Sequence, residues 1–136
     1  MEDMIKNLIQ KAKDASLSAY AKYSGFQVGA AILCGNQKIY TGCNVENVSY
    51  GATICAERTA AVKAVSDGQT DFLMIAVYAD TEDYVYPCGI CRQFLVEFAC
   101  EDMQVIACNH KNEYKIHTLN ELLPHAFISF KEGQNQ

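Results

Sequence analysis

One nearly continuous apolar stretch, residues 72–79, constrains the fold of this chain more than any other segment. The stretch has the length of a strand and is short for a helix. Strands with one wet face alternate between apolar and polar residues, whereas strands buried on both faces form continuous apolar runs. The stretch therefore predicts a central strand of a sheet whose two faces are both covered.

The flanking segments supply helices and further strands. Apolar periodicity and runs of small residues predict helices over 3–19, 55–66 and 88–99. Strands are expected over 26–33, 38–43, 103–108 and 113–117. Thr118 and Glu121 have the spacing of a capping box and predict a short helical turn. This order of elements predicts an α/β sandwich, followed from residue 131 by a loose polar tail.

Length and charge narrow the class of protein. The chain has 136 residues, half of them apolar, which predicts one domain, 1–136, with its own core. No apolar run approaches the roughly 18 residues of a membrane-spanning helix, and the first residues lack the features of a signal peptide. We therefore expect a cytoplasmic protein with no membrane partner. The net charge of −5 and the scattered basic residues argue against nucleic acid and favour a small-molecule substrate.

The seven cysteines are an odd number in a chain without export features, so a disulfide scaffold is not expected. Cys88 and Cys91 have the spacing of a metal knuckle, and Cys55 offers a third thiolate. A catalytic zinc keeps three protein ligands and one open position, whereas a closed structural site needs a fourth Cys or His. No histidine is near in sequence, so these three cysteines predict a catalytic Zn²⁺ site unless folding brings a histidine close. The remaining cysteines are expected to be small buried apolar residues: Cys34, Cys43, Cys100 and Cys108.

Two charged residues follow Cys55. Glu57, taken alone, would be a solvated first-turn residue that complements the helix dipole. Beside a zinc ligand, its carboxylate can instead act as general acid and base. Arg58 is either a surface charge or the cation that balances the thiolates, and we favour the second. Arg92 could serve the metal ligands or a subunit contact, and the sequence leaves that choice open.

Cys55-x-Glu57 and Pro87-Cys88-x-x-Cys91 have the spacing of the zinc nucleobase deaminase signature. With three further segments in the same order, they resemble the small homotetrameric cytidine deaminases over nearly the whole chain. The matching segments are 23–31, 42–47, 55–58, 87–93 and 122–127. The resemblance implies a three-layer α/β/α sandwich with a mixed five-stranded sheet, one Zn²⁺ per subunit and a homotetramer.

The resemblance also implies a reaction, the hydrolytic deamination of cytidine and deoxycytidine to uridine and deoxyuridine in pyrimidine salvage. Glu57 would move the protons of this reaction. The residues implied to hold the nucleoside are Phe26, Asn44, Glu46, Tyr50, Ala56 and Phe127.

Their implied roles differ. Asn44 and Glu46 would bind the ribose hydroxyls, although composition alone favours ordinary turn polarity for both. Phe26 would pack against the pyrimidine, where an ordinary core aromatic is the simpler interpretation. Phe127 would cover the pocket from a neighbouring subunit, with Phe130 as the alternative, and Tyr50 would reach across a subunit boundary.

Three other functions compete with this prediction. A related deaminase could act on another aminated heterocycle, such as blasticidin S. A non-catalytic zinc module for nucleic acid is opposed by the acidic balance and by Glu57. A thiol oxidoreductase using Cys88 and Cys91 would leave Cys55 and Glu57 without a role.

Overall fold

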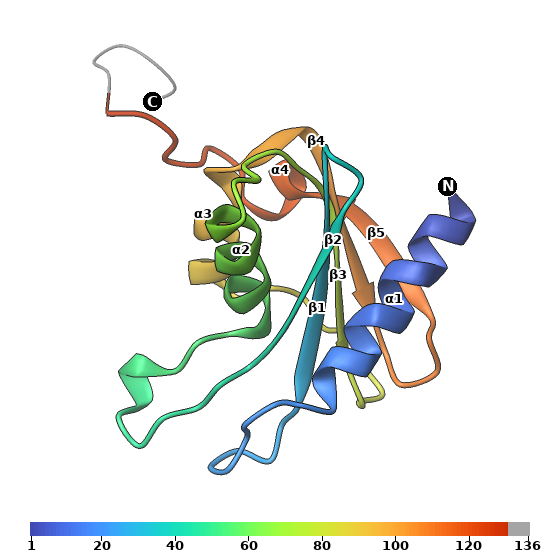
Figure 1. Ribbon diagram of the computed structural model, residues 1–136, viewed down its shortest axis with the longest axis vertical. Coiled ribbons are helices and arrows are strands. Elements are labelled where there is room, and N and C mark those ends of the chain that lie inside the picture. Colours follow the sequence, from blue (N-terminus) through green and yellow to red (C-terminus); the bar gives the residue numbers. More distant parts are fainter. Residues whose placement is uncertain (131–136) are drawn as a thin grey trace.

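The computed structural model describes residues 1–130, and a five-stranded sheet runs through the centre of the molecule (Figure 1). Helix α1 (Glu2–Ser16) covers one face of the sheet. The other face carries helices α2 (Ala56–Ser66), α3 (Gly89–Val96) and the short α4 (Leu119–Leu122). The structure thus confirms the predicted three-layer α/β/α sandwich.

The sheet has the spatial order β2-β1-β3-β4-β5. Its strands are β1 (Val28–Cys34), β2 (Ile39–Cys43), β3 (Phe72–Ala79), β4 (Ala99–Cys108) and β5 (Tyr114–Thr118). Only β3 and β4 pair in parallel, and the other neighbours are antiparallel, so the sheet is mixed. The central strand is β3, and all of its residues except Leu73 are buried, which confirms the prediction from its apolar sequence.

Two apolar cores flank the sheet. On one side, α1 buries a stripe formed by Ile5, Leu8, Ile9 and Ala12. On the other side, α2 contributes a face of alanines that are fully buried: Ala56, Ala60, Ala61 and Ala64. Full burial of a side chain such as Leu8 stabilises the fold by about 1.5–3 kcal/mol relative to exposure.

The small residues on both sides of the β2–α2 contact let the helix rest on the sheet backbone. A Cβ placed on Gly42 of β2 would lie 2.4 Å from the Ala60 nitrogen and 2.6 Å from the Ala56 carbonyl oxygen. Real Cβ atoms do not approach backbone this closely. The absence of a side chain at Gly42 therefore places the first turns of α2 directly against β2.

The third predicted helix is wrong at its C-terminal end. It was expected to reach residue 99, but α3 ends at Val96 and β4 begins at Ala99. The Phe72 N–H donates to the Phe98 carbonyl, and Ala99 pairs with Phe72 in the parallel β3–β4 ladder. Pairing with the central strand thus takes these residues out of the helix.

Other boundaries differ by a few residues. Helix α1 ends at Ser16, short of residue 19, and β1 begins at Val28. The capping box is confirmed, because Thr118 caps α4 and exchanges hydrogen bonds with Glu121. The predicted polar tail lies outside the described residues. No helix formed by residues 1–130 combines the length and apolarity needed to cross a bilayer.

Candidate active site and metal centre

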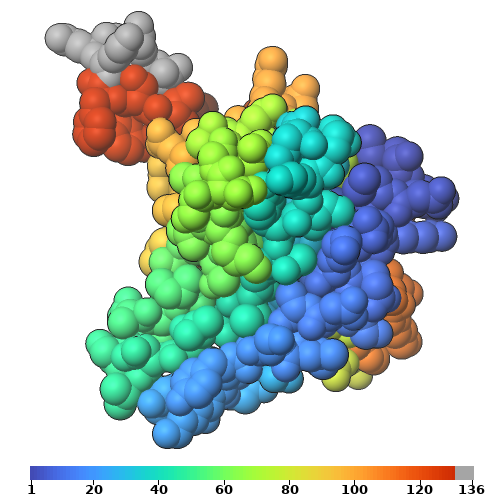
Figure 2. All heavy atoms as spheres, viewed as in Figure 1, coloured from blue at the N-terminus to red at the C-terminus, as the bar shows by residue number. Residues whose placement is uncertain are grey.

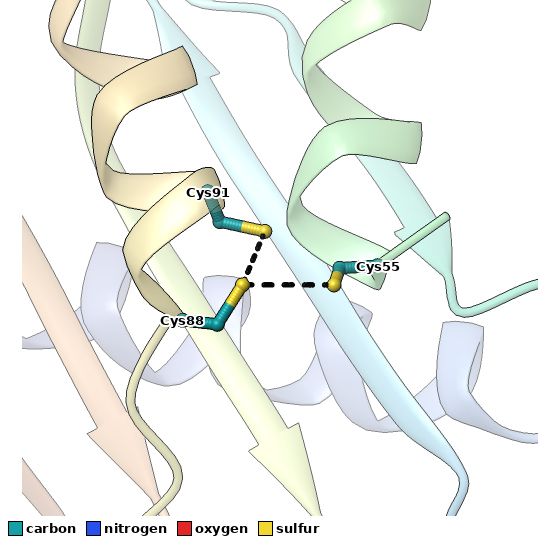
Figure 3. A group of neighbouring side chains, drawn as sticks. All are labelled: Cys55, Cys88 and Cys91. Atoms are coloured by element: carbon teal, nitrogen blue, oxygen red, sulfur yellow. Dashed lines mark hydrogen bonds between the residues drawn. The ribbon is translucent and has the colours of Figure 1, made fainter. Parts of the chain in front are cut away.

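Three cysteine thiols converge where α2 and α3 begin (Figure 3). Cys55 is the N-cap residue of α2, Cys88 is the N-cap residue of α3, and Cys91 lies in the first turn of α3. The Cys88 Sγ lies 3.5 Å from the Cys91 Sγ and 3.8 Å from the Cys55 Sγ, and all three atoms lie within 4.8 Å of one another. An ion about 2.3 Å from each of three tetrahedrally arranged sulfurs holds them about 3.8 Å apart. The cluster therefore fits zinc.

The composition of the cluster leaves room for a further ligand. Within residues 1–130, the group that could hold a metal contains these three cysteines and neither a histidine nor a carboxylate. A structural zinc would require a fourth protein ligand. Folding has not brought a histidine into the group, so the donor set is that of a site with one open position.

The electrostatic environment favours thiolates. Both helices direct their N-terminal ends at the cluster, where the helix dipole and unpaired N–H groups stabilise negative charge. The Nη2 of Arg58 lies 3.5 Å from the Cys55 Sγ and 3.4 Å from the Thr53 carbonyl oxygen. Arg58 therefore contacts a candidate ligand directly, whereas its buried Nε has no hydrogen-bond partner among residues 1–130.

Among the three thiols, Cys55 is the one whose ionised form its surroundings favour. Its pKa falls to about 5, first because Cys91 donates a hydrogen bond to it and then because of Arg58. The pKa of Cys91 is raised correspondingly by its hydrogen bond to Cys55 and by burial. Zinc binding requires all three groups to be thiolates. The positive charge of the ion would add to the stabilisation that Arg58 gives to these thiolates.

Glu57 is buried, with 4% of its surface exposed, which excludes the interpretation of a solvated first-turn residue. Burial raises its pKa to about 7, and the charge of Cys55 adds to this, whereas its own backbone N–H opposes the shift. A carboxyl group whose pKa lies near neutrality can both accept and release a proton. Its position in the first turn of α2, two residues after Cys55, brings it to the wall of a cavity that Cys55 also lines.

That cavity has a volume of about 200 Å³. Its lining residues are Phe26, Val28, Asn44, Thr53, Cys55, Ala56, Glu57, Val85, Tyr86 and Cys88. A second cavity of about 350 Å³ adjoins it, because Thr53 borders both. The second cavity is lined by Tyr23, Ser24, Glu46, Asn47, Tyr50 and Thr53. Most residues that the sequence implicated thus line one of two neighbouring hollows.

Asn44 is buried and its side chain serves the backbone of the segment that leads into β1. Its Oδ1 accepts a hydrogen bond of 2.8 Å from the Val28 N–H, and its Nδ2 donates one of 2.8 Å to the Phe26 carbonyl. These two bonds hold Phe26 at the cavity wall. A side-chain amide can make four hydrogen bonds, so within residues 1–130 one donor and one acceptor position of Asn44 remain for another partner.

Glu46 lines the second cavity. Its Oε1 accepts hydrogen bonds from the backbone N–H groups of Tyr23, at 2.9 Å, and Ser24, at 3.0 Å, and its Oε2 accepts one from the Ser24 hydroxyl. The Ser24 hydroxyl and then its N–H lower the pKa of Glu46. Glu46 is therefore an ionised carboxylate held at a defined place beside the cavity.

The three aromatics assigned to subunit boundaries lie at the surface. Tyr50 opens the 3₁₀ helix η1 (Tyr50–Ala52) with 76% of its surface exposed. Phe127 and Phe130 are 48% and 94% exposed, and neither lines either cavity. The Phe127 carbonyl accepts a hydrogen bond from Gln93 of α3. Figure 2 shows the C-terminal segment, in red, standing out from the body of the molecule, away from the tips around residues 20–25 and 45–52.

Several cavity residues escaped the sequence prediction. Thr53, Val85 and Tyr86 line the cavity from loops, and the ring of Tyr86 also contacts His117, with centroids 5.5 Å apart. In the sequence, only their closeness to Cys55 or Cys88 indicates a place at the site. Ser24, which bonds Glu46, was not predicted as a site residue either, although it lies in the matching segment 23–31.

The expectation that the other four cysteines are buried is confirmed for two of them. Cys34 and Cys108 are buried, and burial raises their pKa to about 11 and about 12, so both stay protonated thiols. Cys43 and Cys100 are only partly buried, and the prediction is wrong in degree for these two.

Comparison with known proteins agrees with this site. The family model for the cytidine and deoxycytidylate deaminase zinc-binding region matches residues 2–107. The chain is 50% identical over 123 residues to a cytidine deaminase of Sporosarcina psychrophila, covering 90% of each chain. It is 48% identical over 122 residues to the cytidine deaminase of Halalkalibacterium halodurans, covering 90% of this chain and 92% of the relative.

A solved structure shares the fold. The cytidine deaminase from Burkholderia pseudomallei superposes with a TM-score of 0.85 at 42% sequence identity, over 89% of this chain and 97% of that one. The extent of the family match and the identity to full-length relatives confirm the resemblance seen in the sequence, and the chain belongs to the cytidine and deoxycytidylate deaminase family.

Proposed function

We propose that this protein is a zinc-dependent hydrolase that converts cytidine and deoxycytidine to uridine and deoxyuridine and releases ammonia. One observation carries the proposal. The buried carboxyl group of Glu57 shares a cavity with Cys55 and Cys88, two members of the three-sulfur cluster that the family's zinc would occupy.

The residues of the site divide the chemistry between them. Cys55, Cys88 and Cys91 would hold zinc, which would supply a Lewis acid that brings the pKa of a water molecule towards neutrality. Glu57 takes a proton from the attacking water and delivers it to N3 of the pyrimidine as oxygen bonds to C4. Glu57 then transfers the remaining hydroxyl proton to the amino nitrogen, the C4–N bond breaks, and ammonia leaves. One water is consumed for each amino group released, and Glu57 ends in the state in which it began.

The cavities support a binding mode for the nucleoside. The base would lie in the smaller cavity, against the ring of Phe26 and the backbone of Ala56, within reach of Glu57. The sugar would extend past Thr53 into the adjoining cavity. There it would meet the ionised carboxylate of Glu46. The amide of Asn44, which lines the smaller cavity, would meet the sugar on its way out of that cavity.

We assign the single domain 1–136 to a homotetramer in the cytoplasm that serves pyrimidine salvage. The exposure of Tyr50 and Phe127 leaves both rings available for contact with a neighbouring subunit. A pocket completed by Phe127 of a neighbour would shield the base from water, so activity would depend on assembly.

The test is ammonia release from a panel of compounds by the zinc-loaded protein. The proposal expects release from cytidine and deoxycytidine and little from free cytosine, since the sugar contacts would be lost. Release from blasticidin S alone would assign the site to another aminated heterocycle. Release from none of the compounds would overturn the proposed reaction.

A further inference from the structure

Arg92 follows the candidate ligand Cys91 directly, but within residues 1–130 its guanidinium bonds backbone and not sulfur. Its Nε donates a hydrogen bond of 2.7 Å to the Pro87 carbonyl, and its Nη1 donates one of 2.8 Å to the Leu122 carbonyl. Leu122 is the last residue of α4. The half-buried side chain of Arg92 thus bridges two segments that lie 35 residues apart in the chain.

The Pro87 carbonyl is a sensitive point for the metal site. It belongs to the same planar peptide unit as the nitrogen and Cα of Cys88, so fixing its direction fixes the backbone from which the Cys88 thiol projects. Pro87 has no N–H of its own, and among residues 1–130 no other donor is found for its carbonyl. In the loop before it, the Val85 N–H donates a hydrogen bond of 3.2 Å to the Cys108 carbonyl.

The chain contains two arginines, and they serve the cluster in different ways. Arg58 contacts the Cys55 sulfur and acts through charge. Arg92 bonds the carbonyl of Pro87, the residue before Cys88, and so bears on the direction of the backbone at Cys88. A planar guanidinium can donate to two carbonyls in different directions, whereas a lysine ammonium on a flexible stem holds such a pair poorly.

We propose that Arg92 is a positioning residue for the metal site: it holds the Pro87–Cys88 peptide in the direction that zinc ligation needs and anchors that peptide to the end of α4. The proposal rests on the zinc site of the proposed function. It explains why a residue beside a metal ligand turns away from the sulfurs, and it resolves the choice that the sequence left open for Arg92 in favour of the ligand environment.

The test measures zinc affinity, by competition for Zn²⁺ with a chromophoric chelator, in Arg92→Ala, Arg92→Lys and the parent protein. Loss of a group that orients a metal ligand typically weakens metal binding about ten- to hundred-fold. We expect a loss of that size in Arg92→Ala and a smaller one in Arg92→Lys. The visible absorption of the Co²⁺-substituted proteins should change as well, because the geometry around the metal changes.

Two controls separate positioning from simple loss of stability. Gln93→Ala removes the neighbouring side chain, which bonds the Phe127 carbonyl and not Pro87, and should leave zinc affinity and the Co²⁺ spectrum unchanged. Thermal unfolding of the zinc-free proteins measures the stability lost with the two carbonyl hydrogen bonds. On adding zinc, the midpoint should rise less in Arg92→Ala than in the parent.

Parental zinc affinity in Arg92→Ala would overturn the inference. So would an equal fall in the midpoints of the zinc-free and zinc-loaded variant, because Arg92 would then stabilise the fold alone. A parent protein that bound no zinc would instead contradict the proposed function itself.

Discussion

The carbonyl oxygen of Ala56 lies so close to Gly42 that a β-carbon at Gly42 would come within 2.6 Å of it. Ala56 stands between Cys55 and Glu57, so this contact sets the height above the sheet of both a candidate metal ligand and the candidate proton-transfer group. The positions of Cys55 and Glu57 depend on the position of the first turn of α2. The backbone of β2 at Gly42 fixes that position.

Gly42→Ala should therefore damage both stability and the site. Overpacking at a backbone contact typically costs about 1–3 kcal/mol, and we expect a loss of this size in the free energy of unfolding measured in urea. Zinc affinity should fall too, since α2 can accommodate the methyl group only by moving its first turn. Gly51→Ala is the matched control, because nothing lies within 4 Å of a Cβ placed there. Equal unfolding midpoints for Gly42→Ala and the parent protein would show that the contact is not tight.

Arg58→Gln should weaken zinc binding by removing the positive charge that contacts the Cys55 sulfur. Three thiolates around a dication carry a net negative charge, and the hydrogen bond from Nη2 offsets part of it. We expect zinc affinity to fall about ten- to hundred-fold in Arg58→Gln and less in Arg58→Lys, which keeps the charge. The chelator competition that measures this should show no change in Lys63→Gln, a charge near the other end of α2. Equal affinities for Arg58→Gln and Lys63→Gln would rule out a charge-balancing role.

Glu46→Ala should reduce kcat/KM for cytidine about ten- to hundred-fold, the equivalent of one charged hydrogen bond of about 1.5–3 kcal/mol. Any residual reaction of free cytosine should be unaffected, because no sugar contact is lost. Ser24→Ala removes the hydroxyl that bonds both Glu46 and the Phe26 N–H and leaves the carboxylate in place, so it separates sugar binding from support of the turn at residues 23–26. If Ser24→Ala lost as much as Glu46→Ala, support of the turn would explain the effect and the sugar-binding role would fail.

The capping box of α4 makes a small part of the stability depend on pH. The Thr118 N–H and hydroxyl hold the pKa of Glu121 below its ordinary value. The unfolded chain therefore binds the proton more readily than the folded one, and the contribution is present at neutral pH and is lost as the pH falls through the folded pKa. Glu121→Ala should lower the unfolding midpoint at pH 7 and lower it less at pH 3. A difference that stayed constant between these pH values would contradict a role for the ionised carboxylate.

The sequence was informative wherever a short local pattern determines the structure. The apolar run of β3, the capping box at Thr118 and the placement of two cysteines at a helix start are all local, and each is confirmed. The approach of α2 to β2 at Gly42 is a tertiary contact, and no periodicity in the sequence predicts it.

Other features depended on tertiary contacts. Helix α3 ends early because Ala99 pairs with Phe72 in another part of the chain. Tyr86 enters the cavity wall through the course of a loop. Asn44 shows the same limit. Its bonds to the backbone at Phe26 and Val28 connect residues 18 and 16 positions away, and its own surroundings in the sequence do not predict them.

The most direct test of the account is ammonia release from cytidine by zinc-loaded Glu57→Gln, with zinc content measured on the same sample. This variant keeps the size of the side chain and removes its ability to carry a proton. We expect parental zinc content and a rate lower by about 10²- to 10⁴-fold, the usual contribution of a general acid–base group. A zinc-loaded Glu57→Gln that released ammonia at the parental rate would contradict the central claim that Glu57 moves the protons of the reaction.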